Sequence, residues 1–166
     1  MSKISKAIFL FSAVAMIAFV AAKASWNDVA TISDSNFTTG KLDITTDPTT
    51  ALFNVAAAFP GWSQTREVTV TNSGTVAFNY VIADEKISGD DILWQSSALH
   101  LKIGTTDGGS DVYDGTLKDL TMGSPRTLAA TESETLYLTL SLDNSAPNTL
   151  QEKTLAVAFH FNATQP

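Results

Sequence analysis

The sequence has no cysteine among its 166 residues and only two histidines. Without cysteine the chain can form no disulfide, no thiol nucleophile and no thiolate metal site. Charged residues make up only 16% of the chain, and acidic residues outnumber basic ones by 17 to 10. Because an acidic surface repels nucleic acid and anionic lipid, we expect no nucleic-acid partner. Stability must therefore come from apolar burial and backbone pairing.

The N-terminus has the pattern of a cleavable secretory signal. Two lysines precede an uncharged, mostly apolar run of 16 residues, 7–22, and small residues follow it. The run is shorter than the about 20 residues that a membrane-spanning helix needs. We therefore predict a signal peptide over 1–24, cut by a signal peptidase between Ala24 and Ser25. The mature protein is then secreted, without stable membrane insertion; a single membrane anchor is the alternative.

Removal of this leader makes the chain more acidic, because the leader contains three lysines and no acidic residue. The net charge of the mature chain is then three units more negative than the −7 of the whole sequence. The remaining length suits one domain with its own core. No linker, repeat or low-complexity stretch divides it, so we predict a single domain over 37–166.

Period-two alternation of apolar residues dominates the mature chain, and threonine or serine fills many of the alternate positions. Six runs show it: 53–59, 68–70, 76–82, 99–103, 136–142 and 155–161. Such alternation places one face of each strand on a core and leaves the other in water. The intervening loops are rich in turn-forming residues. These features predict an all-β fold, an antiparallel jelly-roll-like β-sandwich.

Helix signals are weak and confined to two short segments. Residues 90–95 and 148–153 are predicted to form one short helix each, capped by Asp90 and Asn148. The final run, 155–161, carries four large apolar side chains on one face. Because this face is the densest apolar one late in the chain, we expect the strand to lie in the centre of a sheet.

Few residues in the chain could carry catalysis. His100 and His160 each lie between apolar strand residues, so both imidazoles are predicted to point away from the core. The sequence has no HExxH helix, no G-x-S-x-G elbow and no glycine-rich phosphate loop. A metal site shared by the two histidines would need the topology to bring their strands together. We therefore predict a protein that is not an enzyme and needs no cofactor.

One acidic loop is a weak calcium candidate. Asp107, Asp111 and Asp114 lie close together in the sequence, and calcium favours several oxygen ligands on a flexible loop. Their spacing does not fit the EF-hand loop, and Asp-Gly pairs are ordinary turn formers. The loop therefore predicts either a calcium site or a simple turn.

Two Asn-x-Thr sequons are candidate glycosylation sites, at Asn36 and Asn162. The second asparagine has the outward parity of the last predicted strand. Whether either is modified depends on the machinery of the host.

Several short motifs follow one another along the mature chain. Trp26-Asn27-Asp28 comes directly after the leader, and FTTGKLDI follows at residues 37–44. Further along lie Pro60-Gly61, VTVTNSGT at 68–75, Tyr113-Asp114-Gly115 and FHFNATQ at 159–165. In this order they resemble the TasA/camelysin family of secreted matrix proteins. The family's aromatic-Asn-Asp element and Phe-x-x-Gly-x-Leu-Asp-Leu strand correspond to the first two motifs.

The resemblance implies a jelly-roll subunit that polymerises with copies of itself into extracellular filaments, as biofilm matrix fibres or archaeal bundling pili. In such filaments the N-terminal strand of one subunit completes a sheet of the next. Within the donor strand and connector, 25–36, the strand would consist of Ser25, Trp26, Asn27, Asp28, Val29, Ala30, Thr31 and Ile32. Burying each large apolar side chain contributes about 1.5–3 kcal/mol, and pairing at an edge sets register. The alternative is that this strand folds back onto its own sheet.

Two other functions remain open. Some family members carry the name metallo-endopeptidase, and a metal-dependent enzyme would need His100 or His160 as a ligand. A type IV pilin would instead be cut near Ile8 and keep residues 7–22 as its assembling helix. The mass of the mature N-terminus, beginning near Ile8 or near Ser25, distinguishes a pilin from a fibre subunit.

Overall fold

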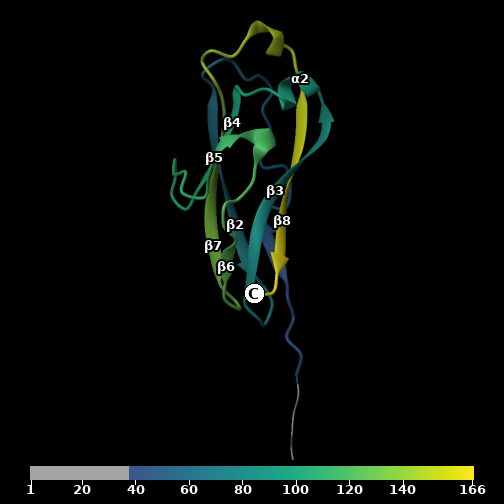
Figure 1. Ribbon diagram of the computed structural model, residues 1–166, viewed down its shortest axis with the longest axis vertical. Coiled ribbons are helices and arrows are strands. Elements are labelled where there is room, and N and C mark those ends of the chain that lie inside the picture. The colour runs from purple at the N-terminus through teal and green to yellow at the C-terminus, as the bar shows by residue number, and fades with distance from the viewer. Residues whose placement is uncertain (1–37) are drawn as a thin grey trace, which may run out of the picture. The chain divides into compact units, whose positions relative to one another are not determined.

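Alternation of apolar and polar side chains along the strands builds a fold of two layers (Figure 1). The computed structural model describes residues 38–166, which form a five-stranded sheet in the order β1-β2-β7-β4-β5 and a three-stranded sheet in the order β6-β3-β8. In chain order the strands are β1 (Ile44–Asp47), β2 (Ser63–Asn72), β3 (Phe78–Gly89), β4 (Leu99–Gly104), β5 (Tyr113–Thr116), β6 (Arg126–Leu128), β7 (Ser133–Leu142) and β8 (Leu155–Thr164). All neighbouring strands are antiparallel. The predicted all-β, jelly-roll-like sandwich is confirmed.

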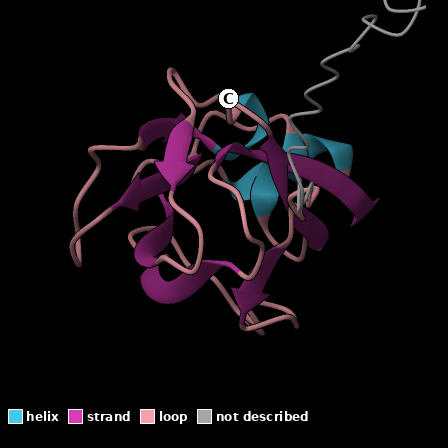
Figure 2. Ribbon diagram, turned by 90° about the horizontal axis from the view of Figure 1, so that it is seen from below, coloured by secondary structure: helices cyan, strands magenta, loops and turns pink. Residues whose placement is uncertain are grey.

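The short helices lie in the connections between strands, as Figure 2 shows. They are α2 (Asp91–Trp94) and the 3₁₀ turns η1 (Leu117–Asp119) and η2 (Asn148–Leu150). Asp90 is the N-cap of α2, but its carboxylate accepts a hydrogen bond from the Thr154 N–H at 2.9 Å and does not cap the helix. The N-cap of η2 is Pro147, so the predicted cap at Asn148 is wrong by one residue. Between residues 38 and 166 no helix is long and apolar enough to cross a membrane.

Five of the six predicted runs lie in strands, and the run at 53–59 does not. This run belongs to the connection between β1 and β2, where Leu52 and Phe53 pack against the core and residues 56–60 are exposed. Three consecutive alanines, 56–58, give it little of the branched or aromatic surface that strands favour. The short strands β1, β5 and β6 were not predicted, because none has an alternating apolar run of its own.

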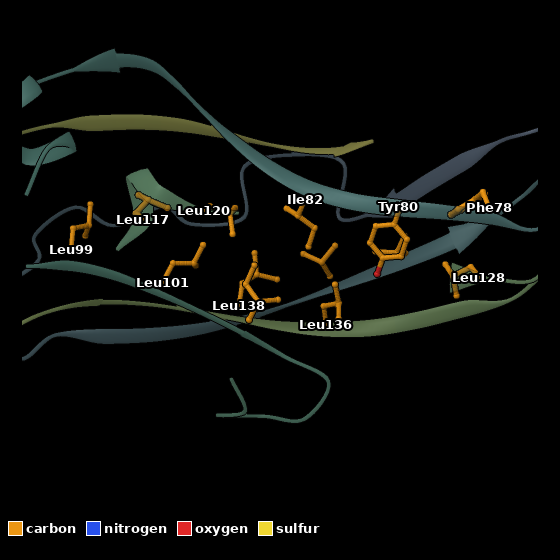
Figure 3. Packing of buried hydrophobic residues seen from close by; sticks show 13 residues of the cluster. Phe78, Tyr80, Ile82, Leu99, Leu101, Leu117, Leu120, Leu128, Leu136 and Leu138 are labelled. Carbon is orange, nitrogen blue, oxygen red and sulfur yellow. The ribbon is translucent and has the colours of Figure 1, made fainter. Parts of the chain in front are cut away.

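The core lies between the two sheets. From β3, Tyr80 and Ile82 face Leu136 and Leu138 of β7, and all four side chains are at most 2% exposed (Figure 3). Other buried members are Val68, Val70, Phe78, Leu99, Leu101, Ile103, Leu117, Leu120 and Leu128. Leu117 and Leu120 belong to the segment that joins β5 to β6, so this segment closes the sandwich on the side of those two strands.

A buried asparagine ties the two sheets together at the end of β2. Asn72 is fully buried, and its Nδ2 donates to the carbonyl oxygens of Val76 (2.9 Å), Leu128 (3.2 Å) and Ala129 (3.0 Å). Its Oδ1 accepts the Gly74 N–H at 2.9 Å. The side chain therefore fixes the turn into β3 and the end of β6 at once.

The last strand, β8, lies at the edge of its sheet, so the predicted central position is wrong. Its only strand neighbour among the described residues is β3, which pairs with β8 on one side and β6 on the other. Its apolar parity is nevertheless as predicted: Phe159 and Phe161 pack against the core, while His160 and Asn162 are exposed. An apolar face indicates which side of a strand meets the core, but not how many strands lie beside it.

We predict that Asn72→Asp lowers the free energy of unfolding by at least about 3 kcal/mol. The substitution keeps the shape of the side chain but buries a carboxylate against three carbonyl oxygens. Urea denaturation followed by tryptophan fluorescence measures the loss. Asn54→Asp, at an exposed position, is the matched control and should change stability by less than about 0.5 kcal/mol. Equal losses in the two variants would contradict the role given to Asn72.

Candidate functional site

The two histidines lie on opposite outer faces of the sandwich. His100 is on β4 in the five-stranded sheet, and its Nε2 lies 3.5 Å from Asp143 Oδ2. His160 is on β8 in the three-stranded sheet, where its Nε2 lies 3.0 Å from Glu85 Oε2. Both side chains point away from the core, as predicted from parity. Because the whole core separates them, the two imidazoles cannot bind one metal ion.

The three acidic residues of the calcium candidate each have a different environment. Asp111 accepts hydrogen bonds from the N–H and the hydroxyl of Thr105, both at 2.9 Å. These two bonds hold the pKa of Asp111 below its ordinary value. Asp114 lies 3.5 Å from the Lys102 ammonium on the neighbouring strand, and Asp107 is exposed in the turn. Within residues 38–166 no three histidine or acidic side chains gather as a metal-binding group.

A polar network crosses the core from β3 to the opposite sheet. The Tyr80 hydroxyl donates to Glu134 Oε1 at 2.5 Å, and the Arg126 Nε donates to Glu134 Oε2 at 2.9 Å. Burial and the hydrogen bond to Glu134 raise the pKa of Tyr80, so it stays protonated and donates at all ordinary pH values. Figure 3 shows the Tyr80 oxygen directed toward the facing layer. The charged and polar groups of Tyr80, Arg126 and Glu134 are paired with one another, and we assign this network to holding the two sheets together.

A carboxylate on β3 is less well satisfied. Asp84 has the inward parity of Tyr80 and Ile82, and its Oδ2 is buried without a hydrogen-bond partner among the described residues. Burial raises the pKa of Asp84, and the negative charge of Asp119 raises it further. Asp84 therefore destabilises the fold at neutral pH. Among residues 38–166 its Oδ2 has no hydrogen-bond partner, so no second acidic group forms a catalytic pair with it there.

A polar pocket of about 540 Å³ lies between Asp111–Val112 and the segment Met122–Thr127. The two charged side chains that line it already have partners, Thr105 for Asp111 and Glu134 for Arg126. The pocket thus offers no uncompensated charge to a ligand.

The outer face of the five-stranded sheet is covered by hydroxyl groups. Cross-strand pairs join β2 to β7: Thr65 to Thr139 at 2.9 Å, Thr69 to Thr135 at 3.5 Å, and Thr71 to Ser133 at 2.8 Å. Because the hydroxyls bond to one another, this face stabilises the pairing of β2 and β7.

The strand edges of the sandwich that have no strand neighbour among residues 38–166 include those of β8 and of the first part of β2. We define the open side as these two free strand edges, that of β8 in the three-stranded sheet and that of Ser63–Val68 of β2 in the five-stranded sheet. The short β1 pairs only with Thr69–Asn72. The inward residues Leu155, Val157, Phe159 and Phe161 of β8 are only half-buried, whereas Phe78, Tyr80 and Ile82 of the neighbouring β3 are at most 2% exposed.

Several predicted sites lie outside the described residues: the cleavage point at Ala24 and Ser25, the strand Ser25–Ile32, and the sequon at Asn36. Asn162 is described, and its side chain is exposed on the outer face of β8. It is therefore accessible for glycosylation.

The chain matches the family described as camelysin metallo-endopeptidase over residues 2–99, which end at the first residue of β4. It belongs to the camelysin family. The TasA/camelysin resemblance of its short motifs is thereby confirmed. No curated protein matches the chain.

The family description names a metal-dependent peptidase, but the described part of this camelysin-family chain supplies no grouped ligands for a metal. His100 and His160 are the strongest single ligands available, and each instead faces a carboxylate on its own sheet surface. Sequence parity anticipated the outward placement of both imidazoles. The open side was not anticipated, since no local signal shows which strand lacks a neighbour.

We predict that the purified protein has no chelator-sensitive peptidase activity. Casein hydrolysis is measured with and without a chelator, in the wild type and in a His100→Ala, His160→Ala double variant. The four rates should be equal, because within residues 38–166 each imidazole has one carboxylate beside it and no group of three ligands, the number that a catalytic zinc site uses. Activity that a chelator abolishes, and that the double variant lacks, would show that this chain is a metallo-endopeptidase.

We predict that Asp84→Asn stabilises the protein at neutral pH and not at pH 3. The raised pKa of Asp84 means that the folded state binds this proton more tightly than the unfolded state. The resulting stability is present below the ordinary value of 3.8 and is lost as pH rises through the higher folded pKa. Urea denaturation between pH 3 and pH 7 should show that the free energy of unfolding of Asp84→Asn, relative to that of the wild type, increases as pH rises. The exposed Asp107→Asn is the charge-matched control, and an identical pH trend there would refute the assignment to Asp84.

Proposed function

We propose that this camelysin-family protein is a secreted structural subunit that polymerises into extracellular filaments. Residues 25–32 of one copy would add as a strand along the open side of the next copy. The observation that carries the proposal is the edge strand β8, whose inward apolar residues are half-buried in a single chain. An added strand would bury them and bond the free edge of the backbone.

The edge of β8 lacks the devices that keep natural edge strands from pairing. Its ten residues, Leu155–Thr164, contain no lysine, no arginine, no acidic side chain and no proline. Long uncharged edges of this kind are templates for another strand. Leaving such an edge unprotected is expected where pairing is the function.

Residues 25–32 fit the edge in length and in composition. Eight residues in an extended strand span about 26 Å, close to the about 33 Å of the ten-residue β8. Trp26 and Ile32, which share one face of an extended strand, supply large apolar side chains, and burying each is worth about 1.5–3 kcal/mol. Lys41 is hydrogen-bonded to Thr75 of its own chain, and the eight residues between Ile32 and Lys41 can reach about 27 Å when extended. They are therefore long enough to reach a neighbouring copy.

Secretion follows in this proposal from the leader at 1–24 and from family membership. A signal peptidase is then the partner during export, and other copies of the chain are the partners afterwards. The chain would act outside the cell, in a biofilm matrix fibre or a bundling pilus. No geometry among residues 38–166 favours the peptidase function over this one.

We predict that deleting Ser25–Ile32 leaves a folded protein that does not form filaments. The buried core is built from residues between 68 and 138, so circular dichroism and the unfolding transition should be retained. Electron microscopy and light scattering should show filaments for the chain 25–166 and none for the variant that lacks Ser25–Ile32.

A point variant gives a finer comparison. Trp26→Ala should weaken assembly because it removes the largest apolar side chain of the segment, while Asn27→Ala, of opposite parity, should assemble as the wild type does. Filaments that persist unchanged after the deletion would rule out strand addition by this segment.

A further inference from the structure

A positive charge lies on the inner face of the five-stranded sheet, at the open side. Arg66 of β2 pairs in register with Leu138 of β7, and cross-strand partners have their side chains on the same face. Leu138 is 0% exposed at the centre of the core, whereas Arg66 is exposed. Arg66 also has the parity of the buried Val68 and Val70. Its guanidinium therefore lies where an added strand would cover it.

This part of β2 has polar groups without partners. No carboxylate of residues 38–166 forms an ion pair with Arg66. Two residues earlier on the same face, Gln64 Oε1 is buried and accepts no hydrogen bond from the described residues. A strand that covered Arg66 without a compensating acid would desolvate a charge at considerable cost. The occupant of the open side must therefore present a carboxylate toward Arg66.

The N-terminal segment has the complementary charge. Between residues 25 and 40 there are two aspartates, Asp28 and Asp34, and no lysine or arginine. Asp28 is the only charged residue within 25–32, and in an extended strand it shares parity with Trp26 and Ile32. When these two apolar side chains face the core of the neighbour, Asp28 faces it too.

We propose that Arg66 of one copy forms an ion pair with Asp28 of the next, and that this pair sets the register of the added strand. The inference rests on the proposed function and specifies the residue that selects the partner strand. A slip by one residue turns Asp28 and both apolar anchors to solvent. A slip by two residues moves the carboxylate away from Arg66, toward Val68 in one direction and Gln64 in the other, and leaves the guanidinium covered without an acid, which disfavours it. In this arrangement the apolar side chains supply affinity for the added strand, and the ion pair selects its register.

The test exchanges the two charges in the full 25–166 chain. Arg66→Glu places two acids together, and Asp28→Lys places two bases together, so each variant alone should raise the critical concentration for filaments at least about tenfold. The double variant, with the charges reversed, should polymerise again. An equimolar mixture of the two single variants should also polymerise, as an alternating copolymer in which every junction pairs opposite charges.

Two controls keep the result interpretable. Glu67→Lys changes a charge at the next position of β2, on the opposite face, and should leave assembly unchanged. Arg66→Lys keeps the positive charge and should assemble close to the wild type. The unfolding transition of each variant, measured below its critical concentration, shows whether it is folded; if Arg66→Glu is not, Arg66→Gln replaces it and should still raise the critical concentration.

The outcomes separate the inference from the function on which it rests. If the wild-type chain forms no filaments, the proposed function fails. If the wild type polymerises and folded Arg66→Glu or Arg66→Gln matches it, the ion pair is wrong while the function stands. If the double variant polymerises but the mixture does not, the pair forms within one chain, and the proposed contact between copies is overturned.

Discussion

The fold depends on the hydrogen bonding of one buried amide. Asn72 ends β2 in the five-stranded sheet, yet its side chain bonds to carbonyls that lead into β3 and out of β6 in the other sheet. A buried amide must find partners for its N–H groups and its oxygen. Because the partners come from two separate segments, the turn into β3 and the end of β6, satisfying Asn72 requires both sheets to be in place. The core contacts between β3 and β7 follow from that alignment.

At the open side, by contrast, backbone groups and side chains lack partners among the described residues of a single chain. The backbone edge of β8 and the half-buried apolar row beneath it are both incomplete in a single chain, and Arg66 adds a positive charge with no acidic partner in residues 38–166. Apolar burial, backbone pairing and charge compensation would all be completed by one extended, acidic and apolar strand. Residues 25–32 have this composition, which is why a single proposal accounts for three separate features.

For the candidate site, the sequence excluded several kinds of catalytic site but did not show where a binding surface lies. Period-two parity placed His100 and His160 outward, and the structure confirms this by putting them on opposite sheets. Parity also placed Phe159 inward and Asn162 outward. It could not show that β8 lies at an edge, that Arg66 lies at the open side, or that Asp111 is bonded to Thr105.

The sequence by itself determined the all-β class, most of the long strands and the face that each presents to the core, because alternation is a local property of neighbouring side chains. The run at 53–59 shows the limit: it alternates, but without a neighbouring strand to bond its backbone it forms a connector. Strand order, the short strands β1, β5 and β6, and the open side were decided only by the tertiary structure. Pairing depends on backbone groups that every residue carries alike, so the side-chain pattern does not encode which strands lie side by side.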